Sequence, residues 1–165
     1  MLKKTTFQRA QGNINVKINN NEINRFYQSG SAKVFYPKSS QKFKELVLVN
    51  TAGGITSGDN FAYDFEIINK SKIFLTTQTA ERAYKGFNEK AKIKISLTVD
   101  DTSNLFWIPQ ELILFNNCNF DRNIEVNLSP DSNFILAETT IFGRIAMGEY
   151  LEQGYFNEQG GLSLN

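Results

Sequence analysis

The residues best suited to chemistry in this sequence are four carboxylates in distinctive local motifs. Asp59 closes a glycine-rich loop, and Glu111 follows a proline that interrupts an aromatic stretch. Glu138 and Glu149 flank a Phe-Gly-Arg segment. Carboxylate oxygens act as acid/base groups and as metal ligands. The chain has no histidine and a single cysteine, which excludes imidazole bases, His-based zinc sites, Ser-His-Asp machinery and internal disulfides.

A dense group of polar side chains follows the apolar residues 73–75. Thr76, Thr77 and Gln78 offer hydroxyl and amide oxygens, which either face a cavity or partner, or end a solvated strand. The solvated strand end is the favoured interpretation. Arg144 lies between Glu138 and Glu149, where a structural Arg–Glu pair is favoured over a functional one.

The loop at residues 50–59 carries glycines at positions 53, 54 and 58. Glycines allow positive φ and the close approach of another backbone or an anion. The loop lacks the Gly-Lys-Ser/Thr of a Walker A motif, and its spacing is not the dinucleotide-binding fingerprint. A structural tight turn is therefore the favoured interpretation.

Charge is distributed unevenly along the chain. The 165 residues hold 18 basic and 17 acidic side chains, yet residues 1–50 have a balance of +7 and residues 101–165 a balance of −7. The favoured explanation is that the two ends neutralise each other in the fold. A basic surface for nucleic acid, membrane or an acidic protein is the alternative. Arginine is scarce beside lysine, which argues against nucleic-acid recognition.

The N-terminus does not have the pattern of a secretory signal, because no apolar run follows its basic residues. No stretch approaches the roughly 18 apolar residues of a membrane span. We therefore expect a cytoplasmic protein without a membrane partner.

The elements that position these residues are strands. Apolar residues alternate with polar ones in several segments, which is the pattern of half-buried strands. Two short apolar runs predict strands covered on both faces. Residues 80–87 fit a helical period as well as a short strand. With many turn signals and no linker, the sequence predicts one all-β domain over residues 1–165. The alternating segments are 13–19, 61–67, 91–99 and 122–128, and the apolar runs are 46–49 and 134–137.

Four stretches, taken in order, resemble the UreD family of urease accessory proteins, called UreH in some bacteria. They are residues 50–59, 75–84, 107–115 and 142–149. The sequence departs from the family pattern at Ser57, Lys85, Gly86 and Phe106. Because chains of this family usually continue further, the resemblance also predicts that the C-terminal part is missing here.

The resemblance implies a β-helix-like wrapping of strands with few or no helices. It also implies a non-enzymatic chaperone that assists nickel insertion into apo-urease. The implied partners are the urease structural subunits and UreF, with UreG reached through UreF. No tightly bound cofactor is implied, only nickel in transit.

Nickel passage requires weak oxygen ligands in series, so that the ion binds and leaves. Asp59, Glu111, Glu138 and Glu149 are nominated as these ligands because they fall within the matching motifs. Further residues are nominated to line the route or face a partner, namely Thr76, Thr77, Gln78 and Arg144. The alternative from another class is a β-helical carbohydrate-active enzyme that uses two of the four carboxylates as an acid/base pair.

Overall fold

The computed structural model describes residues 8–38, 40–87 and 89–164, and the basic segment at residues 1–7 lies outside this part. The described residues form strands and one 3₁₀ turn of three residues, η1 (Ile145–Met147), so no helix in them is long enough to cross a membrane. The strands are β1 (Gln11–Asn19), β2 (Glu22–Gly30), β3 (Ala32–Phe35), β4 (Lys44–Asn50), β5 (Asn60–Ile68), β6 (Lys72–Thr77), β7 (Glu81–Ala83), β8 (Ala91–Val99), β9 (Asn104–Trp107), β10 (Leu112–Leu114), β11 (Asn119–Leu128), β12 (Asn133–Leu136), β13 (Thr140–Phe142) and β14 (Tyr155–Leu164).

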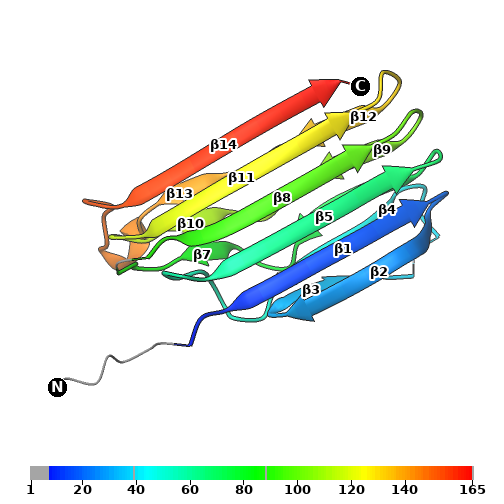
Figure 1. Cartoon of the computed structure of the whole chain (residues 1–165). Coiled ribbons are helices and arrows are strands. Elements are labelled where there is room, and N and C mark those ends of the chain that lie inside the picture. Colours follow the sequence, from blue (N-terminus) through cyan, green and yellow to red (C-terminus); the bar gives the residue numbers. More distant parts are fainter. Residues whose placement is uncertain (1–7, 39, 88, 165) are drawn as a thin grey trace.

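In the described residues the strands wind into a β-solenoid with three sheets (Figure 1). Sheet A has the order β14-β11-β8-β5-β1-β2, sheet B the order β12-β9-β6-β4-β3, and sheet C the order β13-β10-β7. Each coil passes through the three sheets in turn, as in β5-β6-β7 and β8-β9-β10, and neighbouring coils pair in parallel. The prediction of an all-β, β-helix-like fold is confirmed.

The core consists of ladders of apolar side chains that stack from coil to coil inside the solenoid. The register of sheet A places Val16, Phe65, Leu97 and Val126 in one such ladder. These four side chains are buried, because alternate residues of each strand point inward. A neighbouring ladder, Gly12–Phe61–Ile93–Arg122–Glu158, begins apolar and ends charged.

The two ends of the solenoid differ. At one end the chain turns back, so that β2 pairs antiparallel with β1, and β3 pairs antiparallel with β4. At the other end the outermost strands are β14, β12 and β13. Large apolar side chains are exposed on this second end, among them Phe142, Met147 and Leu162.

The structure decides one open alternative and corrects the expectation for the two apolar runs. Residues 80–87 fitted a helical period as well as a short strand, and the strand is correct, because Glu81–Ala83 form β7 and pair with β10. The run at residues 134–137 was expected to be covered on both faces, but Ile135 and Leu136 are exposed because β12 is the outermost strand of sheet B. In the run at residues 46–49 the strand is confirmed, but Val47 and Val49 on its outer face are only partly buried. The four alternating segments are confirmed as strands, and Pro109 lies between β9 and β10.

Candidate functional site

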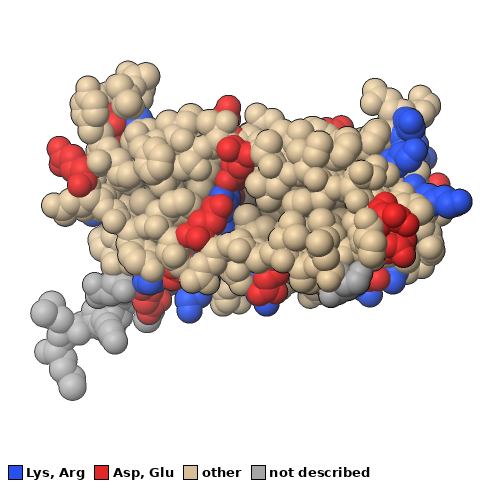
Figure 2. All heavy atoms as spheres, turned by 90° about the horizontal axis from the view of Figure 1, so that it is seen from above, with Lys and Arg blue, Asp and Glu red and all other residues tan. Residues whose placement is uncertain are grey.

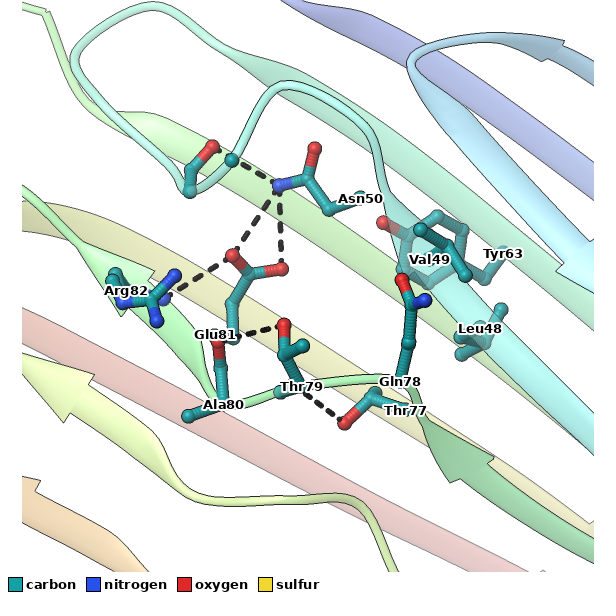
Figure 3. Close-up of a pocket in the computed structure, with 12 residues that line it drawn as sticks. Leu48, Val49, Asn50, Tyr63, Thr77, Gln78, Thr79, Ala80, Glu81 and Arg82 are labelled. Atoms are coloured by element: carbon teal, nitrogen blue, oxygen red, sulfur yellow. Dashed lines mark hydrogen bonds between the residues drawn. The ribbon is translucent and has the colours of Figure 1, made fainter.

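A small cavity of about 50 Å³ lies where sheet B meets sheet C, beside the glycine-rich loop. Figure 3 shows the carboxylate of Glu81 pointing toward the amide of Asn50. The Asn50 Nδ2 atom donates to both Glu81 oxygens at 3.3 Å and to the Gly54 carbonyl at 3.0 Å. The amide thereby connects a largely buried acid to the loop. The cavity is lined by Leu48, Val49, Asn50, Gly53, Gly54, Tyr63, Thr77, Gln78, Thr79, Ala80, Glu81 and Arg82.

Burial raises the pKa of Glu81 from its ordinary value of 4.5 to about 7. The hydrogen bonds from Asn50 and the Arg82 backbone, and the charges of Arg82 and Arg122, act in the opposite direction but do not cancel this effect. Burial, and then the charge of Glu81, raise the pKa of Tyr63, so this phenol stays protonated beside the acid. Glu81 is therefore a group that exchanges a proton near neutral pH inside the solenoid.

The glycines of the loop are required by space as well as by backbone angle. Gly54 has a φ of 147°, and a Cβ atom there would lie 2.3 Å from the Tyr84 ring. Gly53 has a φ of 78° but faces open space. The prediction that this loop is a structural turn is confirmed by its positive φ angles and by the bridge of Ile55 to Ala83.

We expect Gly54→Ala to lower the free energy of unfolding by about 2 kcal/mol, because strain in φ adds to a clash with Tyr84. Gly53→Ala is the matched control and should cost about 1 kcal/mol, from the left-handed backbone alone. Urea unfolding of the two variants measures the difference. Equal losses would contradict the role of close packing at Gly54.

A second polar group lies at the charged end of the ladder, and its centre is Arg122. This side chain is only 7% exposed and forms ion pairs with Glu138 and Glu158. Its Nη1 atom donates to Glu138 Oε1 at 2.9 Å, and its Nε atom donates to Glu158 Oε2 at 2.8 Å. Burial alone would lower the pKa of Arg122, but the two carboxylates outweigh it and raise that pKa.

The Arg122 cluster and the Glu81 cavity are neighbours within the solenoid. The positive charge of Arg122 lowers the pKa of Glu81, which links β7 of one coil electrostatically to β11 of a later coil. Figure 2 looks onto the end formed by β14 and shows a broad uncharged surface, crossed near its middle by acidic side chains over a basic one. Polar groups thus extend from the interior toward this end.

The structure distributes the nominated residues over several places. Thr77 and Gln78 line the Glu81 cavity, and the Thr77 hydroxyl accepts a hydrogen bond from the Gln110 backbone at 3.0 Å. Thr76 does not line this cavity, because strand alternation turns it to the other face of β6 from Thr77, where it is nevertheless buried. The sequence favoured a solvated strand end here, and Gln78 is indeed exposed, but Glu81 close by is not.

The nominated carboxylates occupy separate positions. Asp59 is buried and accepts hydrogen bonds from the backbone of Ala10 and Thr56, each at 2.8 Å, which is the role of a turn cap. Glu111 is partly exposed, and its backbone carbonyl accepts from the Glu81 amide at 2.9 Å. These bonds hold the turn before β5 and the pairing of β7.

Arg144 and Glu149 form the structural pair that the sequence favoured. The Arg144 Nε atom donates to Glu149 Oε2 at 2.9 Å, and the guanidinium lies 4.3 Å from the centre of the Phe115 ring. This hydrogen bond lowers the pKa of Glu149. Glu138, which was nominated beside them, is bonded instead to Arg122.

Sequence reasoning missed Glu81 and Arg122. Glu81 was hidden in a run that fits a helix, and its burial depends on Asn50, which is distant in sequence. Arg122 did leave a signal, since it occupies an inward position of an alternating strand whose other inward residues are apolar. Within the described part of the chain, no three of the carboxylates and the cysteine come close enough to hold a metal ion together.

Comparison with known proteins decides the family. The model of the UreD urease accessory protein family matches residues 8–161. This chain belongs to the UreD family. The UreD protein of Mesorhizobium japonicum is 37% identical over 137 residues, which are 83% of this chain and 49% of that protein. The UreD protein of Rhodopseudomonas palustris strain BisB5 is 40% identical over 132 residues, covering 80% and 47%. UreD 1 of Brucella anthropi is 35% identical over 162 residues, covering 96% and 57%.

The resemblance seen in the four sequence motifs is thereby confirmed. The chain spans about half the length of the UreD relatives it matches, and the match extends along most of the solenoid described above. The Glu81 cavity and the Arg122 cluster both lie within the matched residues.

Proposed function

We propose that this chain acts in urease maturation as a non-enzymatic scaffold and nickel conduit. It would bind the urease structural subunits and UreF, with UreG joining through UreF, in the cytoplasm. Membership of the UreD family supports the role in maturation. The observation that carries the conduit is the succession of polar groups from the Glu81 cavity to the Arg122 cluster, inside a solenoid whose core is mostly apolar.

The chemistry of these groups suits an ion in transit. The carboxylates of Glu81 and Glu138 are already bonded to Asn50 and Arg122, so a cation has to compete for their oxygens. Such competition weakens binding, which a carrier needs in order to release its cargo. Nickel is here the cargo of the protein rather than a resident cofactor.

The alternative of a carbohydrate-active enzyme has less support. A glycosidase needs two carboxyl groups that face each other across the scissile bond. Asp59 is engaged as a turn cap, Glu138 by Arg122 and Glu149 by Arg144. Three of the four nominated acids are therefore bonded within the fold, so Glu111 has no second free acid among them with which to form an open pair.

The conduit is tested by neutralising carboxylates along the proposed route. We expect Glu138→Gln and Glu81→Gln to lower nickel loading of co-expressed urease by about tenfold, the size typical for losing a group that supports a metal ligand. Loading is measured as nickel per purified urease, together with pull-down of UreF and urease. Glu125→Gln is the control, because Glu125 pairs with Lys94 on the outer surface.

The outcomes separate the two halves of the proposal. An assembled complex with unchanged nickel loading would reject Glu138 and Glu81 as route residues. Failure of the wild-type chain, and of a full-length UreD relative tested alongside it, to join urease and UreF would reject the scaffold itself.

A further inference from the structure

The outer faces of sheets A and B have opposite character. On sheet A the outward positions are polar throughout the middle of the sheet, as in Asn15, Asp64, Ser96 and Glu125, which stand in one row across β1, β5, β8 and β11. On sheet B the corresponding row is Glu45–Phe74–Phe106–Ile135, across β4, β6, β9 and β12. On a sheet with one solvated face, the outward positions of each strand are normally polar. The outer face of sheet B does not follow this rule.

The apolar surface on sheet B extends over neighbouring rows, in which Glu45 and Thr76 are the polar members. Phe106 stacks on Phe43 with ring centres 4.8 Å apart, and the next row brings Phe35 beside Val47. Phe35 is 57% exposed and Ile135 is 49% exposed. Contiguous exposed apolar surface of this kind marks an interaction site. We call this surface the sheet B patch, and it consists of Phe35, Phe43, Val47, Val49, Phe74, Phe106, Ile108 and Ile135.

Lysines surround one side of the patch. Lys33 and Lys72 stand on the same outer face, at β3 and at the start of β6. The segment leading into β4 adds Lys38 and Lys42, against the single carboxylate of Glu45. The uneven charge of the sequence contributes here, because Lys33, Lys38 and Lys42 are three of the nine basic residues in residues 1–50.

We propose that the sheet B patch binds a protein segment with an apolar face and acidic flanks, such as an amphipathic helix. The apolar stripe of the segment would cover Phe74, Phe106 and Ile135, and its carboxylates would meet the lysines. The inference deepens the proposed function, on which it rests for the biological role of the partner. A membrane surface fits less well, because Glu45 lies within the apolar row and would be carried into lipid.

The test uses two designed helical peptides that share one leucine stripe, flanked by glutamates in the first and by lysines in the second. We expect the acidic peptide to bind the 165-residue chain at least tenfold more tightly than the basic peptide, with affinity that falls as salt is added. Titration calorimetry at two salt concentrations measures this. Peptide binding needs no urease or nickel, so its result is independent of urease activation.

Three variants locate the binding. Ile135→Glu should weaken binding of the acidic peptide at least tenfold. The double variant Lys33→Glu, Lys72→Glu should weaken this binding by a similar factor while the apolar side chains stay unchanged. Thr98→Glu, on the outer face of sheet A, is the matched control and should bind as the wild type does. Circular dichroism confirms that each variant is folded.

Four results would overturn the inference. They are equal binding of the two peptides, binding that the patch variants leave unchanged, binding to phosphatidylcholine–phosphatidylglycerol vesicles in place of the peptide, and a dimer that Ile135→Glu abolishes in sedimentation velocity. The last result would assign the patch to a second copy of the chain.

Discussion

Arg122→Met should lower the free energy of unfolding by about 3 kcal/mol, because it leaves Glu138 and Glu158 without their cation in a poorly solvated place. The side chain of Glu138 is 14% exposed and that of Glu158 is 38% exposed, so Glu138 carries most of the expected cost. Urea unfolding measures the change as a lower midpoint with an unaltered slope.

A second substitution distinguishes an unpaired charge from lost packing. Arg122→Met combined with Glu138→Met should recover most of the loss, since a buried ion pair can be replaced by apolar groups at little cost. Arg144→Met is the control for an exposed pair with Glu149, and it should change stability far less. If Arg122→Met and Arg144→Met destabilised the chain equally, the Arg122 cluster would not be the buried junction that its contacts indicate.

The alternation of side chains predicted the fold class and most strands of sheet A. The segment Ala91–Val99 has the same bounds in sequence and structure, because its inward residues are all apolar and its outward residues all polar. The repeat of the coils could not be recognised in the sequence. Phe61, Ile93, Arg122 and Glu158 occupy equivalent places, yet they are unequally spaced and chemically unlike, so no fixed period appears in the sequence.

Only those residues of the candidate site that lie together in one sequence motif were predicted. Thr77 and Gln78 were identified as polar groups at a strand end, and they do line a cavity. Asn50 and Tyr63, which line the same cavity, come from β4 and β5, and their distance in the sequence concealed them. The winding of one coil from β11 to β13 determines the partner of Glu138, because it places Arg122 beside this carboxylate, while Arg144 pairs with Glu149. Long-range register is the information that a single sequence lacks.

The stability of the chain should fall as pH rises through neutrality, because Glu81 titrates near pH 7 in the folded protein and near 4.5 when unfolded. Below pH 4.5 the carboxyl group is protonated in both states. Between 4.5 and 7 only the folded state holds the proton, so its contribution to stability is progressively lost as pH increases. The full loss corresponds to about 3 kcal/mol, reached above pH 7.

Glu81→Gln should remove this dependence while preserving the contact with Asn50, because the amide oxygen of glutamine still accepts a hydrogen bond. Tyr63 and Arg122, whose pKa values are both raised, keep one charge state between pH 5 and 8, and the amide of Asn50 is uncharged, so the slope belongs to Glu81. Urea unfolding at pH 5, 6, 7 and 8 should show that the free energy of unfolding of the variant increases relative to that of the wild type as pH rises.

Glu111→Gln serves as the control for Glu81→Gln, since Glu111 is the partly exposed acid beside the same strand pairing. It should leave the wild-type pH dependence unchanged. A wild-type stability that stays level from pH 5 to 8, or a Glu81→Gln variant that keeps the wild-type slope, would show that Glu81 is not buried as a carboxylic acid. The cavity would then be open to water, and a cation could reach Glu81 without first displacing a proton.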